Sequence, residues 1–145
     1  MSATWGAGLF QDDLATDFAA QIVDGDGLAV LRRALAAAGQ ARGHLLYEFA
    51  VQGLIAAEVL AALGGQPAKA MPPELQDWVV AHRSDAIRDA LWSLARSAVE
   101  RVKQDSEISE LWARSNEFGR WIEKVDDLLS RLAQAASASL PTGSR

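Results

Sequence analysis

The chain has no cysteine among its 145 residues, so disulfide bonds, thiolate metal ligands and a cysteine nucleophile are all excluded. It has only four prolines, at positions 67, 72, 73 and 141, which leaves long stretches free to form helices. Near its start no basic segment precedes a continuous apolar run, so we expect no secretory signal. These absences favour a helical protein of the reducing cytoplasm.

The sequence patterns of several enzyme classes are absent as well. The chain has no P-loop, no dinucleotide-binding glycine pattern and no G-x-S-x-G nucleophile motif. The segment DGDG at 24–27 does not continue as a calcium loop, because leucine and alanine occupy positions that need oxygen ligands and a glycine. We therefore expect no cofactor, and a protein that is not an enzyme.

The most apolar stretch is interrupted by polar residues. In HLLYEFAVQGLIAAEVLAAL, residues 44–63, the side chains of His44, Glu48, Gln52 and Glu58 would fall on one narrow face of a helix. Polar and charged groups are costly inside a lipid bilayer, so this stretch is not predicted to span a membrane. It predicts instead the central helix of a soluble bundle, buried on most sides.

Negative charge is concentrated in the first half of the chain. Residues 1–65 hold seven acidic and three basic residues, a net charge of −4, whereas residues 66–145 are nearly balanced, with twelve acidic and eleven basic residues. No lysine or arginine precedes Arg32. Such a surface repels nucleic-acid phosphates and attracts a basic protein, so we expect a protein partner and no nucleic acid.

Apolar residues recur at helical spacing almost throughout, and no alternation is long enough to predict a strand. The pattern predicts an all-α, single-domain bundle of five to seven helices around the long Ala/Leu-rich helix. Residues 1–135 should form the domain, and residues 136–145 a flexible polar tail. The expected helices cover residues 13–23, 28–38 and 43–63, a short segment beginning at Pro72 and Pro73, residues from a cap at Ser84 or Asp85 to about 103, a short segment around 108–112, and residues 117–135.

Three aspartates, Asp13, Asp17 and Asp24, share the polar side of the first predicted helix. The preceding Asp12 is suited to cap this helix, because its carboxylate can accept a hydrogen bond from a first-turn amide. Neighbouring carboxylates could also hold a divalent cation. Capping and solvation explain these aspartates more simply, and their side of the helix is then available to a partner.

A candidate metal site lies in the polar stripe of the long helix. His44 and Glu48, four residues apart, would project from the same face and, with Glu58, could share a metal ion. The other histidine, His82, has no Glu-x-x-His pattern that would complete a di-metal bundle. Solvated or hydrogen-bonded polar groups are therefore the simpler interpretation.

Trp92 is the tryptophan that least fits the predicted core. Most of the five tryptophans should pack between helices, because each buries a large area. Trp92, however, lies off the stripe formed by Ile87, Leu91 and Leu94. This offset predicts a boundary position or an interface, with a partner or with a second copy of the chain.

The opening WGAGLFQDDLATDF resembles the W-G-x-G-x-F-x-N-D-x-A-x-D-W motif of a bacterial family known as domain of unknown function 4259. Two later parts of the chain, AAEVLAALGGQPA with PPELQDWV and VKQDSEISELW with WIEKVDDLLSRL, are similar to that family as well. The resemblance implies a small cytoplasmic helical protein without an established activity or catalytic residues. The positions that match the motif are Trp5, Gly6, Gly8, Phe10, Asp13, Ala15 and Asp17, while Asp12 and Phe18 replace the usual Asn and Trp.

We interpret this motif as a structural anchor. Trp5 and Phe10 would pack into the bundle, and Gly6 and Gly8 would let the backbone turn close against it. The whole sequence then predicts a non-enzymatic interaction protein with an acidic N-terminal surface, of which an immunity- or antitoxin-like inhibitor is one version. The alternative is a small metal-binding or hydrolytic bundle that uses carboxylates of the first and third predicted helices.

Overall fold

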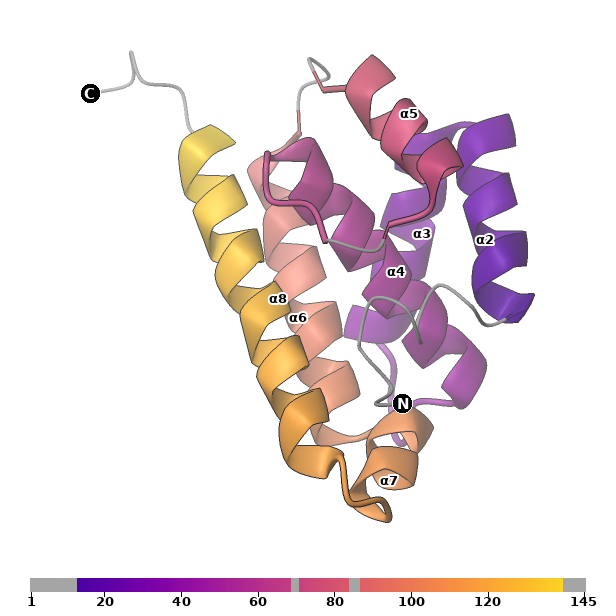
Figure 1. Ribbon diagram of the computed structural model, residues 1–145, viewed down its shortest axis with the longest axis vertical. Coiled ribbons are helices and arrows are strands. Elements are labelled where there is room, and N and C mark those ends of the chain that lie inside the picture. Colours follow the sequence, from indigo (N-terminus) through magenta and orange to yellow (C-terminus); the bar gives the residue numbers. More distant parts are fainter. Residues whose placement is uncertain (1–12, 69–70, 84–86, 140–145) are drawn as a thin grey trace.

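A computed structural model of the chain describes residues 13–68, 71–83 and 87–139. These residues form seven helices and, apart from one isolated bridge, no β-structure, so the expected all-α bundle is confirmed (Figure 1). The helices are α2 (Asp13–Asp24), α3 (Gly27–Gly39), α4 (Tyr47–Leu63), α5 (Pro73–Ala81), α6 (Asp89–Gln104), α7 (Glu107–Ala113) and α8 (Phe118–Ser139). The predicted anchor residues Trp5, Gly6, Gly8, Phe10 and Asp12 lie outside the described residues, as do the predicted caps Ser84 and Asp85.

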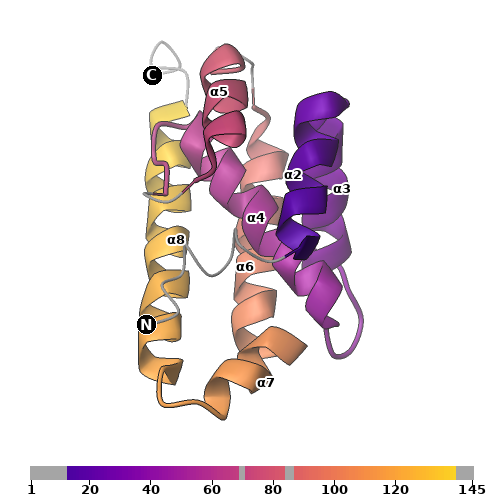
Figure 2. The ribbon, with the colours of Figure 1, turned by 45° about the vertical axis from the view of Figure 1, so that its right-hand side comes forward.

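The alanine- and leucine-rich α4 is the central helix, as expected. Thirteen of its seventeen residues are buried, and it contacts all six of the other described helices. It crosses between the α2–α3 pair and the α6–α8 pair (Figures 1 and 2). Its neighbours approach closely where α4 has glycine: a Cβ on Gly53 would lie 2.8 Å from the Cβ of Ala38 in α3. None of the described helices is long and apolar enough to cross a membrane.

The helix ends follow local sequence signals. The DGDG segment separates α2 from α3, and Oδ1 of Asp26 accepts a hydrogen bond from the amide of Ala29 at 3.3 Å. At the end of α4, Gly65 adopts a φ of 90°, which favours glycine. The amide of Gln66 donates to the carbonyl of Ala61 at 2.8 Å, and that of Gly65 to Ala62 at 2.9 Å, which is a Schellman motif.

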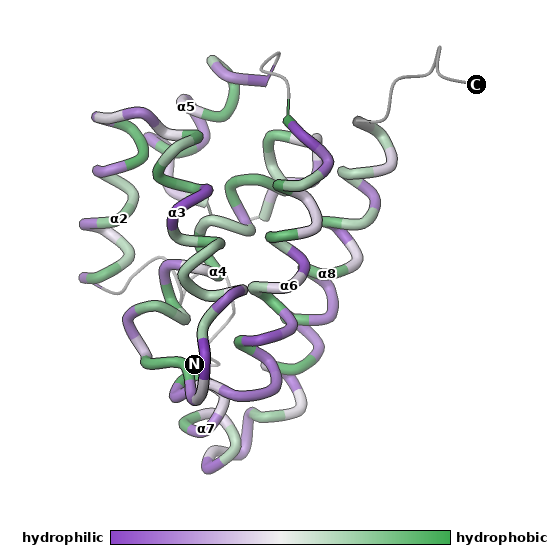
Figure 3. Tube along the Cα trace, turned by 180° about the vertical axis from the view of Figure 1, so that it is seen from behind, coloured by the Kyte–Doolittle hydropathy of each residue, from purple (hydrophilic) through white to green (hydrophobic). Residues whose placement is uncertain are grey.

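The outer helices are amphipathic, and polar and apolar segments alternate along α2 and α8 (Figure 3). On α2, the buried residues recur every three or four positions, which directs one side toward the core; they are Ala15, Phe18, Ala19 and Ile22. The same spacing on α8 buries Trp121, Val125, Leu128, Leu132 and Ala135. This spacing is the reason that the sequence predicted these two helices.

The predicted start of the long helix is wrong. We expected it at residue 43, whereas α4 begins at Tyr47. The preceding segment forms a parallel bridge to the α6–α7 corner instead: the amide of Leu45 donates to the carbonyl of Asp105 at 3.1 Å, and the amide of Glu107 donates to the carbonyl of Leu45 at 2.8 Å. Backbone groups bonded in this way cannot also form a helical turn.

Two further boundaries differ from the prediction. α8 continues to Ser139, so the predicted polar tail from residue 136 begins four residues too early. Ala135 is buried and Ala136 partly buried against the core, which favours continuing the helix. α6 begins at Asp89, later than the predicted cap, because Arg88 has extended backbone angles.

Candidate functional site

The three aspartates that the sequence selected form one exposed face of α2, which we call the acidic face: Asp13, Asp17 and Asp24. At about 100° per residue they fall on the same side of the helix, opposite Phe18 and Ile22 in the core. α2 has no basic residue in its last turn, and none of the three carboxylates forms an ion pair with a described residue. The acidic face therefore presents to solvent carboxylates that no cation of the described residues pairs with.

Several carboxylates on α6 and α8 lie within ion-pair distance of a cation. Oδ1 of Asp126 lies 2.7 Å from Nζ of Lys103, and Oδ2 of Asp127 lies 2.7 Å from Nε of Arg131. Glu100 pairs with Arg96 at 3.2 Å. Among the described residues, these carboxylates have cationic partners that Asp13, Asp17 and Asp24 lack.

Of the two simpler interpretations that the sequence left open for Glu58, a solvated or a hydrogen-bonded group, the structure shows the second. Its side chain is fully buried, and both of its carboxylate oxygens contact Arg131 of α8, at 2.8 and 3.0 Å. Burial would lower the pKa of Arg131, but its hydrogen bonds to Glu58 and Asp127 outweigh this effect and raise it. Glu58 and Arg131 thus form a bidentate ion pair that joins α4 to α8.

His44 lies in the segment before α4 and contacts two acids from the α6–α7 corner. Its Nδ1 is 2.6 Å from Oδ1 of Asp105, and its Nε2 is 3.2 Å from Oε1 of Glu110. Because α4 begins at Tyr47, His44 and Glu48 do not share a helical face. Glu48 is exposed on the first turn of α4.

The predicted metal site is therefore not assembled. His44 contacts two other carboxylates, Glu58 faces an arginine inside the bundle, and Glu48 points to solvent. Within residues 13–68, 71–83 and 87–139, no group of three or more His, Asp or Glu side chains is arranged to hold a metal ion. The sequence could not anticipate this, because the partners of His44 and Glu58 are 61 to 73 residues away along the chain.

Trp92 is buried, with 5% of its surface exposed, so the structure does not place it at a boundary, and an interface that includes it stays a prediction. Its ring packs against Gly64, where a Cβ atom would come within 2.9 Å of the indole. α6 contacts α3, α4 and α8, so its buried side is wide: Leu94 lies against Gly39 of α3, while Trp92 lies against Gly64 at the end of α4. The predicted stripe of Ile87, Leu91 and Leu94 is only partly buried.

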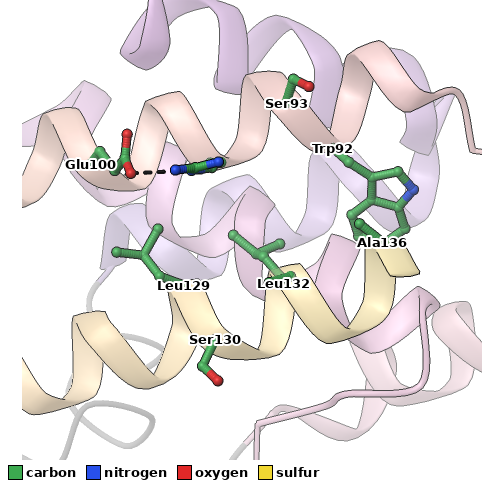
Figure 4. Close-up of a pocket in the computed structure, with 9 residues that line it drawn as sticks. Trp92, Ser93, Glu100, Leu129, Ser130, Leu132 and Ala136 are labelled. Atoms are coloured by element: carbon green, nitrogen blue, oxygen red, sulfur yellow. Dashed lines mark hydrogen bonds and ion pairs between the residues drawn. The ribbon is translucent and has the colours of Figure 1, made fainter. Parts of the chain in front are cut away.

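Trp92 forms one end of an open groove of about 520 Å³ between α6 and α8 (Figure 4). The pair of Arg96 and Glu100 lies on the α6 side, and Leu129 and Leu132 line the α8 side. The indole N–H of Trp92 is buried and donates to no described residue. The groove thus combines an apolar floor with a locally neutral wall, unlike the acidic face.

The fold and these sites define a helical bundle with a largely buried central helix and an outer helix that carries the acidic face. The chain belongs to the family described as domain of unknown function (DUF4259), whose sequence profile matches residues 3–124. No curated protein and no solved structure matches the chain. The family expected from the sequence is thereby confirmed, and the match includes the acidic face, His44 and Glu58.

Proposed function

We propose that this protein is a non-enzymatic, cytoplasmic interaction domain that binds a more basic protein through the acidic face of α2. One observation carries the proposal: Asp13, Asp17 and Asp24 are exposed on one side of a helix and form no ion pair with a described residue. Unscreened charge of one sign accelerates encounter with an oppositely charged partner and orients it. An immunity- or antitoxin-like inhibitor is one version of this function.

The geometry favours this proposal over the metal-binding or hydrolytic alternative. That alternative needs His44, Glu48 and Glu58 to converge with carboxylates of α2. Glu58 instead forms a buried pair with Arg131, and His44 is held by Asp105 and Glu110. The carboxylates of α2 are exposed, and within the described residues they form no metal-holding group with either.

The test compares two charge reversals of equal size. Asp17→Lys reverses a charge in the middle of α2, and Glu123→Lys reverses an equally exposed charge on α8, at the other side of the bundle (Figure 1). Wild type and both variants are used as bait in the native cytosol, and proteins retained by wild type and Glu123→Lys but lost with Asp17→Lys are identified. Each such protein is then purified, and its Kd is measured against NaCl concentration.

We expect Asp17→Lys to weaken binding by about tenfold, and Glu123→Lys to leave it within about twofold. The Kd of the wild type should rise steeply with salt, since exposed charges are screened. Equal losses in the two variants, a Kd that does not depend on salt, or no protein retained by the wild type would contradict the proposal.

A further inference from the structure

We propose that His44 is a proton-dependent clamp that fastens the segment before α4 to the α6–α7 corner and releases it when the imidazole loses its proton. Both ring nitrogens face carboxylate oxygens: Nδ1 faces Asp105 at 2.6 Å, and Nε2 faces Glu110 at 3.2 Å. A neutral imidazole has a single N–H, so its other nitrogen would direct a lone pair at a carboxylate. Protonation of both ring nitrogens therefore makes the two contacts favourable at once.

The clamp is one of several contacts that join the segment before α4 to α6 and α7. Leu45, next to His44, is bonded through its amide to the carbonyl of Asp105 and through its carbonyl to the amide of Glu107. Arg101 of α6 donates to the carbonyl of Gly43 on the other side of His44. Oε1 of Glu107 in turn accepts from the first amide of α4, that of Tyr47, at 2.6 Å. A loosened segment 43–46 would therefore weaken the capping of α4.

The charged groups around His44 come from α6, the α6–α7 corner and α7. Asp105 and Glu110 contact the ring. A guanidinium nitrogen of Arg101 lies 3.8 Å from the second carboxylate oxygen of Asp105. The carboxylate of Glu107 accepts a hydrogen bond from the amide of Tyr47. The hydrogen bond to Asp105 raises the pKa of His44 above its ordinary value of 6.5, against the effect of burial, and the charge of Glu110 raises it further. The contribution to stability is therefore present at low pH and is lost as the pH rises through the pKa of His44 in the folded protein.

His82 provides an internal control. It is the other histidine of the chain, its Nδ1 lies 2.8 Å from the carbonyl oxygen of Trp78, and its ring stacks on that indole with 4.2 Å between centroids. A neutral imidazole with its proton on Nδ1 satisfies this contact, so it requires no second proton. Loss of a proton from the other nitrogen of His82 would therefore leave this contact in place.

The experiment is an NMR titration of the full chain from about pH 5 to about pH 9, with hydrogen exchange of the Leu45 and Glu107 amides corrected for intrinsic rates. We expect His44 to titrate above its ordinary pKa of 6.5, and protection of the Leu45 and Glu107 amides to fall about three- to tenfold once His44 is neutral. Glu110→Gln, a change at an exposed side chain, should lower the pKa of His44, and His44→Gln should remove the pH dependence of amide protection. A pKa of His44 at or below 6.5, or amide protection that is equal before and after its titration, would overturn the proposal.

Discussion

At the residue scale, the pair formed by Glu58 and Arg131 is the most consequential contact in the described structure. Glu58 is fully buried, and the guanidinium is 13% exposed and also contacts the carbonyl of Gln66 at 3.2 Å. A buried ion pair is costly to desolvate, and removing one partner leaves the other charge in a poorly solvated site. The pair is therefore a point where a single substitution has a large effect.

We expect Arg131→Met to lower the free energy of unfolding by about 3–5 kcal/mol, because it takes the cation away from the buried carboxylate. The double variant Glu58→Leu/Arg131→Met removes both charges and should recover most of this loss. Arg120→Met, at an exposed arginine of the same helix, serves as the control and should change stability by less than about 0.5 kcal/mol. Urea unfolding measures all three variants, and equal stabilities of the two single variants would contradict this account.

At the element scale, glycine determines how closely α3 and α4 approach. Gly53 is buried in the middle of α4, against the methyl group of Ala38, which is fixed directly to the backbone. A side chain at this position would have to separate the two helices. Gly119 near the start of α8 differs, since a Cβ there would meet no atom within 4 Å of the described structure.

These two glycines make a matched pair of tests. Gly53→Ala should destabilise the protein by about 1–3 kcal/mol, because the clash with Ala38 exceeds the gain in helix propensity. Gly119→Ala should stabilise it by up to about 1 kcal/mol, since only the propensity changes. Thermal unfolding of both variants measures these changes in stability. A stabilising Gly53→Ala would contradict the account, because it would show that α3 and α4 can move apart at little cost in free energy.

Element ends show where sequence reasoning succeeds and where it stops. The ends of α2, α3 and α4 agree with the prediction to within about one residue, because glycine turns and caps are local signals. The start of α4 was misplaced because the segment around Leu45 bonds to residues 105–107, which no local signal reveals.

The exposed position of the three aspartates was predictable in the same way as the helix ends, since it follows from periodicity alone.

At the scale of the whole molecule, the helices share one continuous core built around α4. Tryptophans are spread through it: Trp78 lies on α5, Trp92 on α6, Trp112 on α7 and Trp121 on α8. Because all of these helices pack against α4 or against its direct neighbours, none has an apolar core of its own. The predicted single domain should therefore unfold as one unit.

We expect urea unfolding followed by tryptophan fluorescence and by far-ultraviolet circular dichroism to give coincident transitions. Single-tryptophan variants that retain only Trp78 or only Trp121 test the two ends of the bundle separately. A transition of Trp78 at clearly lower urea concentration would show that α5 unfolds independently, and the single-domain prediction would then be wrong.

The sequence by itself determined the fold class, the identity of the central helix and the exposure of Asp13, Asp17 and Asp24, because helical periodicity and turn residues act over a few positions. Only the tertiary structure decided the partners of Glu58 and His44 and the burial of Trp92. These depend on which faces of distant helices meet, and the contacts of Glu58 and His44 join residues more than sixty positions apart. The direction of a polar side chain in a bundle is determined by the helix packed against it, since a buried charge must find an opposite charge there.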